Sequence, residues 1–516
     1  MTKENIKTLK DLLAKSAELY GDKVFLKEKK GREVIETSFS QLCEKAKRVG
    51  SFIMKQAQGR TIHAALIGAT SSAYLTAYFG TACSGNVIVP LDAQMKEADL
   101  CDHLRRSDAE IFFFDKKFSS MLDAVKENCP QVKTFVSLQE LDNETSIAEI
   151  LDNYEPMEWK PLDPESICAI LFTSGTTGLS NGVMLRHRNL IDNAMCEEDD
   201  GRPDDVLLSV LPIHHVYCFT CDILLSLRGG ITVCVNDSMM HIAQNLKFFK
   251  PTLILLVPMI ADTIYRKIKS AVEADLSLDI NAVAKSVFGG NLRGIFSGGA
   301  YLNPKLAEAY RSFGIPIAQG YGMTECSPRI STGHLADTNS GSIGTIVNGC
   351  EVKIVDGEIW AKSPSVMAGY YKNPEATAEA LTKDGWLRTG DLGYVDNTNH
   401  LYITGRKKNL IILSNGENVS PEELENKFSG LDWLSEVLIY AEDGMITAEI
   451  YPNQEFLEEN GREKVEELFR NHVAEINKTV STAKAVRRMR IRDIEFTKTT
   501  SKKIKREQEV TGALLD

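Results

Sequence analysis

The N-terminal half of the chain alternates between segments with helical apolar spacing and short apolar runs. Helical spacing occurs in Leu9–Tyr20 and Ser40–Gln56, and Ala73–Cys83 is a third expected helix. The short runs are typical of buried strands, and they are Ala64–Ile67, Asn86–Pro90, Glu110–Phe114, Thr134–Ser137, Ile167–Phe172 and Ile231–Val235. Because strands that alternate with helices form parallel sheets, this pattern predicts an α/β fold.

The pattern changes after Arg406, where charge density rises and the glycine- and threonine-rich short strands end. The elements expected beyond this point are helices over Pro421–Phe428 and Arg462–Lys478 and strands over Glu436–Tyr440 and Ile446–Tyr451. We therefore expect a large N-terminal α/β domain over residues 1–406, with several subdomains and parallel sheets, and a small α+β C-terminal domain over residues 407–516.

Composition and charge exclude several classes of protein. Of the 516 residues, 43% are hydrophobic and 25% are charged, which is a globular composition and excludes disorder and collagen-like repeats. The net charge is −12, from 59 Lys+Arg against 71 Asp+Glu, whereas a general nucleic-acid binder usually carries an excess of positive charge. We therefore expect no nucleic-acid partner.

Cysteine usage and the apolar runs predict a cytoplasmic protein. The eleven cysteines are scattered and odd in number, which favours reduced thiols over a disulfide framework. The polar segment Met1–Lys10 shows no secretory leader. The longest apolar run, Leu253–Ala261, contains Pro258 and is too short to span a bilayer, so no transmembrane segment is expected.

The first segment with a clear chemical implication is Ile167–Gly182. An apolar strand leads directly into Thr173-Ser174-Gly175-Thr176-Thr177-Gly178, and a helix is expected to begin near Arg186. Glycines allow a close backbone approach, and hydroxyls and free amides are donors suited to phosphate oxygens. No Gly-Lys-Ser/Thr follows, so this is not a Walker loop. A flexible surface turn is the alternative, which the buried strand feeding into the loop disfavours.

Thr173–Gly182 resembles the phosphate-loop signature of the adenylate-forming superfamily, which includes acyl-CoA synthetases, aryl-CoA ligases, luciferases and peptide-synthetase adenylation domains. Further segments resemble the family's motifs in the family's order. They are Ser297–Ala300 and Gly320–Glu325 for adenine and Mg²⁺, Thr389–Asp391 for ribose, Gly405–Arg406 for the approach to the hinge, and Phe496–Arg506 for the catalytic lysine. Because the matches run in order from Thr173 to Arg506, chance similarity is excluded.

The resemblance implies that a carboxylic acid is activated with ATP. A carboxylate attacks the α-phosphorus, pyrophosphate leaves, and the acyl-AMP then passes its acyl group to a thiol. Negative charge gathers on phosphate oxygens in the first transition state, so catalysis rests on positioning and cationic stabilisation. Lys503 is the expected catalytic residue, because it precedes Ile504-Lys505-Arg506 as the family's lysine precedes Ile-x-Arg. Glu325 is the expected Mg²⁺ ligand.

The resemblance also implies a set of ATP-binding residues in what would be an adenylation domain. They are Thr173, Ser174, Gly175, Thr176, Thr177, Gly178, Gly299, Ala300, Tyr301, Gly320, Tyr321, Gly322, Met323, Thr324, Asp391 and Arg406. Thr173–Gly178 would hold the β- and γ-phosphates, and Thr324 would meet the α-phosphate. Asp391 would accept hydrogen bonds from the ribose hydroxyls, with Arg406 nearby. The sequence GDLG around Asp391 is also typical of a surface β-turn, which is the alternative.

Leu211–Tyr217 resembles the segment that borders the acyl pocket, with His215 and Val216 as pocket residues. A loop histidine without such a role is the alternative for His215. Amino-acid-activating relatives carry an aspartate where Val216 stands, so an α-amino acid is disfavoured, and Asp222 is not expected to replace that aspartate. Cys218–Cys221 forms a lone CxxC, which predicts helix packing rather than a zinc site. The sequences of the motifs are most similar to those of bacterial medium- and long-chain fatty acyl-CoA synthetases.

The chain departs from the family's pattern at three places. Ser180-Asn181 replaces the Pro-Lys at the end of the phosphate loop and removes a positive charge that could meet pyrophosphate. Lys502 replaces a glycine and is a second candidate for the catalytic lysine. Asn415-Gly416 replaces a Gly-Gly that lines the thiol passage, although asparagine tolerates the left-handed conformation. The resemblance places the hinge of a mobile C-terminal domain two residues after Arg406, at Lys408.

The expected substrates and cofactors are ATP, Mg²⁺, a small-molecule carboxylic acid and coenzyme A. An acyl-AMP ligase that loads the phosphopantetheine arm of an acyl carrier protein is the alternative within the superfamily. A luciferase-like oxidative activity has no support in the sequence beyond shared ancestry. A degenerate protein that binds nucleotide without turnover is a third class, suggested by Asn181 and Lys502.

Overall fold

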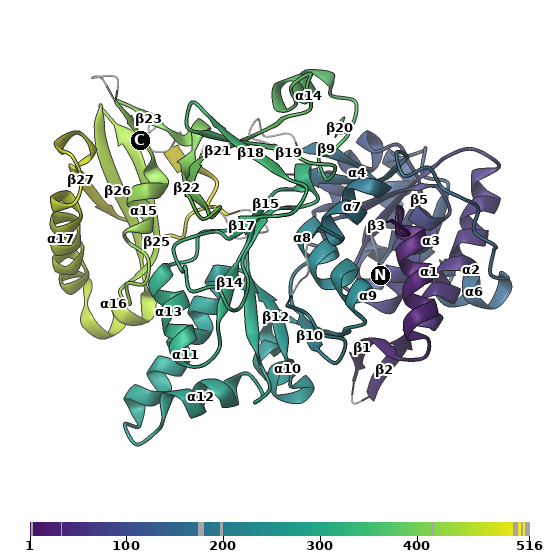
Figure 1. Cartoon of the computed structure of the whole chain (residues 1–516), viewed down its shortest axis with the longest axis horizontal. Coiled ribbons are helices and arrows are strands. Elements are labelled where there is room, and N and C mark those ends of the chain that lie inside the picture. Colours follow the sequence, from purple (N-terminus) through teal and green to yellow (C-terminus); the bar gives the residue numbers. More distant parts are fainter. Residues whose placement is uncertain are drawn as a thin grey trace. The chain divides into compact units, whose positions relative to one another are not determined.

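The computed structural model of the chain describes residues 1, 4–31, 33–173, 180–196, 200–413, 417–498, 504–506 and 509–510 (Figure 1). The chain forms two compact units. The large unit comprises Met1–Leu302, Ala307–Val352 and Ala361–Arg388. The small unit comprises Asn303–Leu306, Lys353–Trp360 and Thr389–Asp516.

The first sheet of the large unit has eight strands in the order β20-β9-β8-β4-β3-β5-β6-β7. The strands are β3 (His63–Ile67), β4 (Val87–Leu91), β5 (Ala109–Phe114), β6 (Thr134–Ser137), β7 (Thr145–Ser146), β8 (Ile167–Thr173), β9 (Asn181–Arg186) and β20 (Gly369–Tyr370). The pairs from β8 across to β7 are parallel, while β9 pairs antiparallel with both β8 and β20.

The second sheet of the large unit has seven strands in the order β14-β13-β12-β10-β11-β1-β2. The strands are β1 (Val24–Lys30), β2 (Glu33–Ser38), β10 (Val206–Ser209), β11 (Thr232–Val235), β12 (Leu253–Leu256), β13 (Gly294–Ser297) and β14 (Ile317–Gln319). All pairs are parallel except the β1–β2 hairpin. A smaller antiparallel sheet follows, with β15 (Tyr321–Gly322), β16 (Arg329–Thr332) and β17 (Thr345–Ile346).

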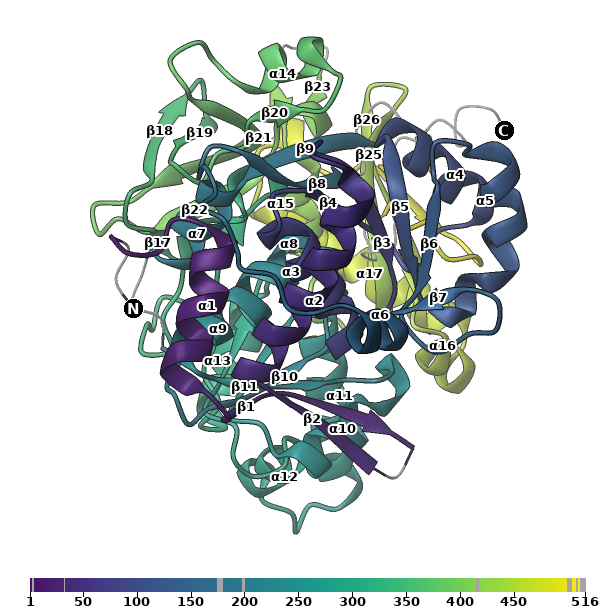
Figure 2. The ribbon, with the colours of Figure 1, turned by 90° about the vertical axis from the view of Figure 1, so that its right-hand side faces the viewer.

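Helices cover these sheets, the first three of them where the apolar spacing predicts helices. They are α1 (Leu9–Tyr20), α2 (Phe39–Ala57), α3 (Ser72–Cys83), α4 (Glu97–Arg106), α5 (Leu122–Asn128), α6 (Ile147–Asn153), α7 (His187–Ala194), α8 (Val216–Cys218), α9 (Leu225–Gly229), α10 (Ile242–Phe249), α11 (Pro258–Ala274), α12 (Ile280–Val287), α13 (Pro304–Ser312) and α14 (Pro374–Ala380). Figure 2 shows α4 and α5 beside β5 and β6, where Leu100, Leu104 and Val125 pack with Phe112 in one apolar core.

The small unit contains two further sheets. The four-stranded sheet has the order β18-β19-β21-β22, with β18 (Glu351–Val355), β19 (Glu358–Lys362), β21 (Leu387–Val395) and β22 (Leu401–Arg406). The other sheet contains β25 (Leu434–Glu442), β26 (Met445–Pro452) and β27 (Arg488–Ile491). The remaining elements are β23 (Ile411–Ile412), β24 (Asn418–Val419), α15 (Pro421–Asn426), α16 (Gln454–Asn460) and α17 (Arg462–Lys478). Apolar side chains of α15, α17, β25 and β26 form one core, as expected for an independent α+β layer.

The α/β class and the small α+β part are confirmed. The strand β9 was missed, because its sequence NGVMLR is short and lacks alternation, and the antiparallel pairing with β8 supplies what propensity does not. The strand β21 lies partly in the small unit together with β22, so the predicted boundary at residue 406 stays a prediction. Among the described residues, no helix is both long and apolar enough to cross a membrane.

Candidate active site

The carboxyl ends of β13 and β14 place two predicted adenine and Mg²⁺ segments side by side. The two strands are parallel neighbours, with Ser297 in register with Gln319. The amide of Gly320 donates a hydrogen bond to the carbonyl oxygen of Ser297 over 2.9 Å. The segment that contains Gly299, Ala300 and Tyr301 therefore leaves the sheet next to the segment Gly320–Glu325. Ligands of open α/β sheets commonly bind outside such carboxyl ends.

Glycine is required in both segments for identifiable reasons. Gly299 has a φ of 81°, in the left-handed region that side chains disfavour. A Cβ on Gly322 would overlap the carbonyl group of Pro328, because β15 and β16 approach closely there. Beside them Tyr301 is 46% exposed, so its ring is available to a ligand. These glycines set the path of the backbone. They do not themselves indicate a planar ligand such as adenine, which would be met by neighbouring side chains such as Tyr301.

Glu325, the predicted Mg²⁺ ligand, lies in a short 3₁₀ turn at Thr324–Cys326 that follows Met323. Its carboxylate is 7% exposed and accepts a hydrogen bond from the hydroxyl of Tyr370 over 2.8 Å. The Glu325 carbonyl also accepts from the amide of Met367 over 2.9 Å. Mg²⁺ is usually held by one or two carboxylates together with substrate phosphates, so a single positioned carboxylate fits that ion. Tyr370 was not found by sequence reasoning.

The same segment connects Glu325 to the strand after the predicted phosphate loop. Tyr370 lies on β20, and β20 pairs with β9. The amide of Ala368 donates to Met184, and the amide of Tyr371 donates to Gly182 over 2.7 Å. At the start of the loop Thr173 is in register with Asn181. The large unit therefore brings the two ends of the predicted phosphate loop and Glu325 into one hydrogen-bonded framework, while Ser174–Gly178 lie outside the described residues.

The predicted acyl-pocket residues follow the carboxyl end of β10. Val216 is buried, and His215 lies against His214, with ring centroids 4.1 Å apart. Burial and the neighbouring His215 lower the pKa of His214 to about 3, against a weaker opposing effect of Asp92. The imidazole of His214 is therefore neutral at pH 7. The neutral ring of His214 suits an uncharged acyl chain.

Tyr217 is a further candidate for the site that the sequence did not reveal. A side-chain Cβ at Gly298 would lie 3.1 Å from Cζ of Tyr217, so the tyrosine ring is in contact with the segment after β13. Burial, Cys221 and Asp222 raise the pKa of Tyr217, so the ring remains neutral. An aromatic residue directly after the pocket pair His215-Val216 was the available signal.

Asp222 is fully buried in the π-helical turn Phe219–Leu224. It accepts hydrogen bonds from the hydroxyl of Ser209 over 2.6 Å and from the thiol of Cys218 over 3.3 Å. Burial raises the pKa of Asp222 to about 7 against the effect of those two donors. These contacts support a structural role for Asp222 and for Cys218–Cys221. No three metal-ligating side chains gather anywhere in the described ranges.

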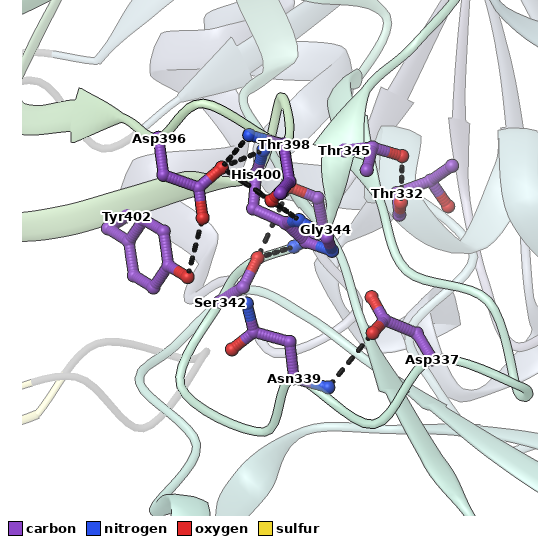
Figure 3. A network of polar contacts seen from close by, with 10 residues as sticks. All are labelled: Thr332, Asp337, Asn339, Ser342, Gly344, Thr345, Asp396, Thr398, His400 and Tyr402. Atoms are coloured by element: carbon purple, nitrogen blue, oxygen red, sulfur yellow. Dashed lines mark hydrogen bonds and ion pairs between the residues drawn. The ribbon is translucent and has the colours of Figure 1, made fainter.

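A small hollow adjoins β14 in the large unit. Its lining includes Arg311, Gln319, His334 and Asp337, so it is mostly polar. The loop that closes it is held by short-range hydrogen bonds, among them the one from the amide of Asn339 to Asp337 (Figure 3). The hollow is lined by Gln319, which precedes Gly320. Its polar lining does not suit an apolar acyl chain.

In the small unit, Asp391 and Arg406 form a cross-strand ion pair. They are in register on β21 and β22, and Nε of Arg406 lies 2.6 Å from Oδ1 of Asp391. Asp391 is 5% exposed, so the turn suggested by GDLG is wrong. The glycines there serve a different purpose: a Cβ on Gly393 would overlap the backbone of Tyr402 on the paired strand. The pair leaves Asp391 as an acceptor held in one place by a cation.

Glu358 completes this cluster and was missed. It accepts hydrogen bonds from Lys407 over 2.9 Å and from the amide of Gly390 over 3.0 Å. Burial raises the pKa of Glu358, but the donors, Trp360 included, outweigh burial and leave the pKa below its usual value. Glu358 therefore holds the backbone of Gly390, next to Asp391. It also holds the side chain of Lys407, which precedes the predicted hinge residue Lys408. Lys408 follows in the 3₁₀ turn Lys407–Asn409 and is exposed.

The segment that carries the predicted catalytic lysine is anchored at both ends within the small unit. Phe496 is buried beside Leu438, and Lys498 pairs with Ile504 in a β-bridge. Arg506 donates to the carbonyl of Ile439 over 2.9 Å and forms an ion pair with the buried Glu425. Lys503 and Lys502, like the predicted thiol-passage residues Asn415 and Gly416, lie outside the described residues. Their assignments stay predictions.

Comparison with known proteins identifies the family. Residues 13–371 match the family described as AMP-binding enzyme, and residues 408–511 match the AMP-binding enzyme C-terminal domain. The chain therefore belongs to the AMP-binding enzymes, and the predicted membership in the adenylate-forming superfamily is confirmed.

Curated relatives are similar over part of their length. A 4-coumarate–CoA ligase of Vanilla planifolia is 30% identical over 415 residues, which span 74% of this chain and 72% of that enzyme. The peroxisomal long chain acyl-CoA synthetase 7 of Arabidopsis thaliana is 33% identical over 331 residues, which span 55% of this chain and 47% of that enzyme. The chain thus matches only about half of the second relative.

Solved structures show the same fold. The anthranilate CoA ligase AuaEII in complex with anthranoyl-AMP superposes with a TM-score of 0.85 at 21% identity, over 100% of this chain and 99% of that one. ATP-bound MatB from Rhodopseudomonas palustris gives a TM-score of 0.82 at 21% identity, over 98% and 99%. At this identity the likeness establishes the fold.

Replacement of Asp391 by asparagine is expected to weaken ATP binding by about 10- to 100-fold, because hydrogen bonds to a charged acceptor contribute roughly 1.5–3 kcal/mol. Calorimetric titration with ATP measures this. Asp396→Asn is the matched control, since Asp396 accepts from Thr398, His400 and Tyr402 between β21 and β22 (Figure 3). The control is expected to melt at a lower temperature and to bind ATP normally. Equal ATP affinity in Asp391→Asn and the parent would show that Asp391 is structural.

Replacement of Tyr370 by phenylalanine removes the donor that orients Glu325 and is expected to raise the Mg²⁺ concentration required for tight ATP binding by roughly tenfold, a common cost of losing a hydrogen bond behind a metal ligand. Titration of Mg²⁺ at fixed ATP measures this. Tyr371→Phe is the control, because Tyr371 donates to Asp108 over 2.6 Å instead. An unchanged Mg²⁺ requirement in Tyr370→Phe would remove Tyr370 from the site.

Proposed function

We propose that the chain is an AMP-forming acid–thiol ligase that converts a carboxylic acid to an acyl-AMP and then to an acyl-CoA. The observation that carries the proposal is the framework in which Glu325, the two ends of the predicted phosphate loop and the glycine segments after β13 and β14 are bonded together in the large unit. Family membership supports the same chemistry. Loading of a carrier-protein phosphopantetheine arm is the alternative acceptor.

The first half-reaction forms a bond between a carboxylate oxygen and the α-phosphorus and breaks the α–β phosphoanhydride bond. Pyrophosphate leaves with the bonding electron pair. Thr173–Gly178 would hold the β- and γ-phosphates, Thr324 the α-phosphate, and Lys503 would bridge the carboxylate and the α-phosphate. Glu325 would hold Mg²⁺, which would supply charge neutralisation at the phosphates. These groups act by positioning and by stabilising negative charge.

The second half-reaction forms a thioester. The thiol sulfur attacks the acyl carbonyl carbon, AMP departs with the electrons of the C–O bond, and the thiol proton passes to solvent. Asp391 would hold the ribose through its hydroxyls during both steps, with Arg406 keeping the carboxylate in place. Asn415 and Gly416 would line the path of the thiol.

The acid is proposed to be a fatty or other acyl acid. Val216, buried where amino-acid-activating relatives carry an aspartate, and the neutral His214 support an uncharged chain. Relatives named as a long chain acyl-CoA synthetase and as a 4-coumarate–CoA ligase support fatty and aryl acids alike. A cytoplasmic location remains a prediction.

Acid-dependent exchange between ATP and labelled pyrophosphate tests the proposal. A panel of medium- and long-chain fatty acids, aryl acids and α-amino acids is expected to give exchange with fatty or aryl acids and none with amino acids. Subsequent addition of coenzyme A or a phosphopantetheinylated carrier protein identifies the acceptor. Tight ATP binding without exchange for any acid would favour the degenerate nucleotide-binding protein.

The assignment of Lys503 predicts separate effects on the two half-reactions. Lys503→Ala is expected to lower pyrophosphate exchange by about 10²–10³-fold, as removal of a charge-stabilising group commonly does. Conversion of supplied acyl-AMP to thioester should persist. Lys505→Ala, two residues away and exposed, is the control. Normal exchange in Lys503→Ala together with loss in Lys502→Ala would move the assignment by one residue.

The assignment of Lys408 as the hinge predicts the opposite pattern. Lys408→Pro fixes φ of residue 408 near −65° and restricts the backbone of Lys407 as well. The C-terminal domain is therefore expected to lose the rotation between adenylation and thioester formation. Adenylation should survive while thioester formation falls steeply in single-turnover measurements, and Lys408→Ala should retain both steps. Equal losses in both steps would indicate general damage, and normal thioester formation would exclude Lys408 as the pivot.

A further inference from the structure

The C-terminal end of α4 reaches both strands that border the predicted phosphate loop. The guanidinium of Arg106 lies 5.3 Å from the ring centroid of Phe172, which stands on β8 just before the loop. The same guanidinium donates from Nη2 to the carbonyl of Ser180 and from Nη1 to its hydroxyl over 3.3 Å. Ser180 directly precedes β9. A cation is thus fixed at the base of the loop from outside it.

His103, one turn earlier on α4, completes the contact with Ser180. Its Nδ1 lies 2.7 Å from the carbonyl oxygen of Asp99, and a carbonyl can only accept, so Nδ1 carries the proton. Its Nε2 therefore accepts the hydroxyl proton of Ser180 over 2.9 Å. The hydroxyl oxygen of Ser180 then has its lone pairs available for Arg106. Burial lowers the pKa of His103 against smaller opposing effects, so Arg106 is the cation in this group.

Arg106 retains donors for a further acceptor. A guanidinium has five N–H groups in a planar fork. The contacts to Ser180, together with an ion pair from Nη1 to Asp102 over 3.2 Å, account for three of them. The remaining two have no hydrogen-bond partner within the described part of the chain. The side chain is 32% exposed, so an anion can reach it.

The position coincides with the place where the chain lacks a family lysine. Asn181 stands there, and its side-chain oxygen accepts a hydrogen bond from the amide of Asn373 over 3.0 Å. The side chain of Asn181 is therefore hydrogen-bonded to the segment that follows β20, and it supplies no charge. Arg106 brings a permanent charge to the neighbouring residue, and guanidinium matches phosphate oxygens better than a point charge does.

We propose that Arg106 binds the terminal phosphates of ATP, and the departing pyrophosphate, in place of the loop lysine that Asn181 replaces. The inference rests on the proposed function, because it assigns Arg106 to the phosphates that the ligase cleaves. Arg106 acts as a binding residue through its two open N–H groups, while its bonds to Ser180 hold the guanidinium in position. Asp102 neutralises part of its charge.

Comparison of ATP with AMP tests this without requiring turnover. Only ATP carries the β- and γ-phosphates, so Arg106→Gln is expected to weaken ATP binding by about 10- to 100-fold and AMP binding by less than about twofold, as measured by calorimetry. Arg106→Lys should fall between the parent and Arg106→Gln. Arg105→Gln is the matched control, since Arg105 is exposed and donates a hydrogen bond to the carbonyl of Asn128 over 3.4 Å, away from the phosphate loop. It should bind both nucleotides normally.

Two further variants separate charge from structure. Adding Asn181→Lys to Arg106→Gln should restore most of the lost ATP affinity, because it returns a positive charge to the loop. Asp102→Asn should leave ATP affinity unchanged or increase it. Equal weakening of ATP and AMP, unchanged ATP binding in a folded Arg106→Gln, or an Asp102→Asn variant that imitates Arg106→Gln would overturn the proposal. An ATP-selective loss of binding in Arg106→Gln, together with no acid-dependent exchange in the parent protein, would refute the proposed ligase function and leave the role of Arg106 intact.

Discussion

Parallel pairing of β10, β12, β13 and β14 is the constraint on which the candidate site depends. Parallel strands end at the same edge of a sheet, so each strand of this group delivers its following loop to one side. The register of Ser297 with Gln319 decides that the two glycine segments begin together, and the contact of Tyr217 with Gly298 adds the loop after β10. Chemistry-bearing residues far apart in sequence thereby become neighbours.

The acidic side chains predicted to bind ligand, one in each unit, are each held by a donor from another element of the same unit. Tyr370 on β20 donates to Glu325, and Arg406 on β22 pairs with Asp391. Such groups cost free energy when buried unless they are paired, so these donors allow carboxylates to be placed where cations or hydroxyls of a ligand are to be met. The same logic extends to Arg106, whose bonds to the base of the phosphate loop fix a cation where the loop itself provides none. Positioning, rather than reactive side chains, characterises this site, which agrees with the demands of nucleotidyl transfer.

Sequence reasoning predicted helices such as α1, α2 and α17 and buried strands such as β3 and β8, because long apolar periodicity and short buried runs carry that information. Other elements, among them α11 and β12, were not predicted. It recovered the order of the motifs but not the groups that support them: Tyr370, Glu358 and Arg106 lie far from the motifs in sequence and meet them only through strand pairing or helix packing. The glycines around Asp391 suggested a surface turn as the alternative to ribose binding, whereas Asp391 lies on β21 and Gly393 allows the close approach of the paired strand. Lys503 and Ser174–Gly178 lie outside the described residues, so there the sequence remains the sole basis for the assignments.

The central claim is that a carboxylate oxygen of the substrate becomes bonded to the α-phosphorus of ATP. Incubation of the full chain with ATP, Mg²⁺, coenzyme A and an accepted acid labelled with ¹⁸O in its carboxylate tests this directly, with mass spectrometry of the nucleotide product. The account predicts AMP that carries one ¹⁸O atom, since the bridging oxygen stays with phosphorus when the thioester forms. Release of ADP with the label in inorganic phosphate, or of AMP without label, would contradict an acyl-adenylate and with it the assignment of the site.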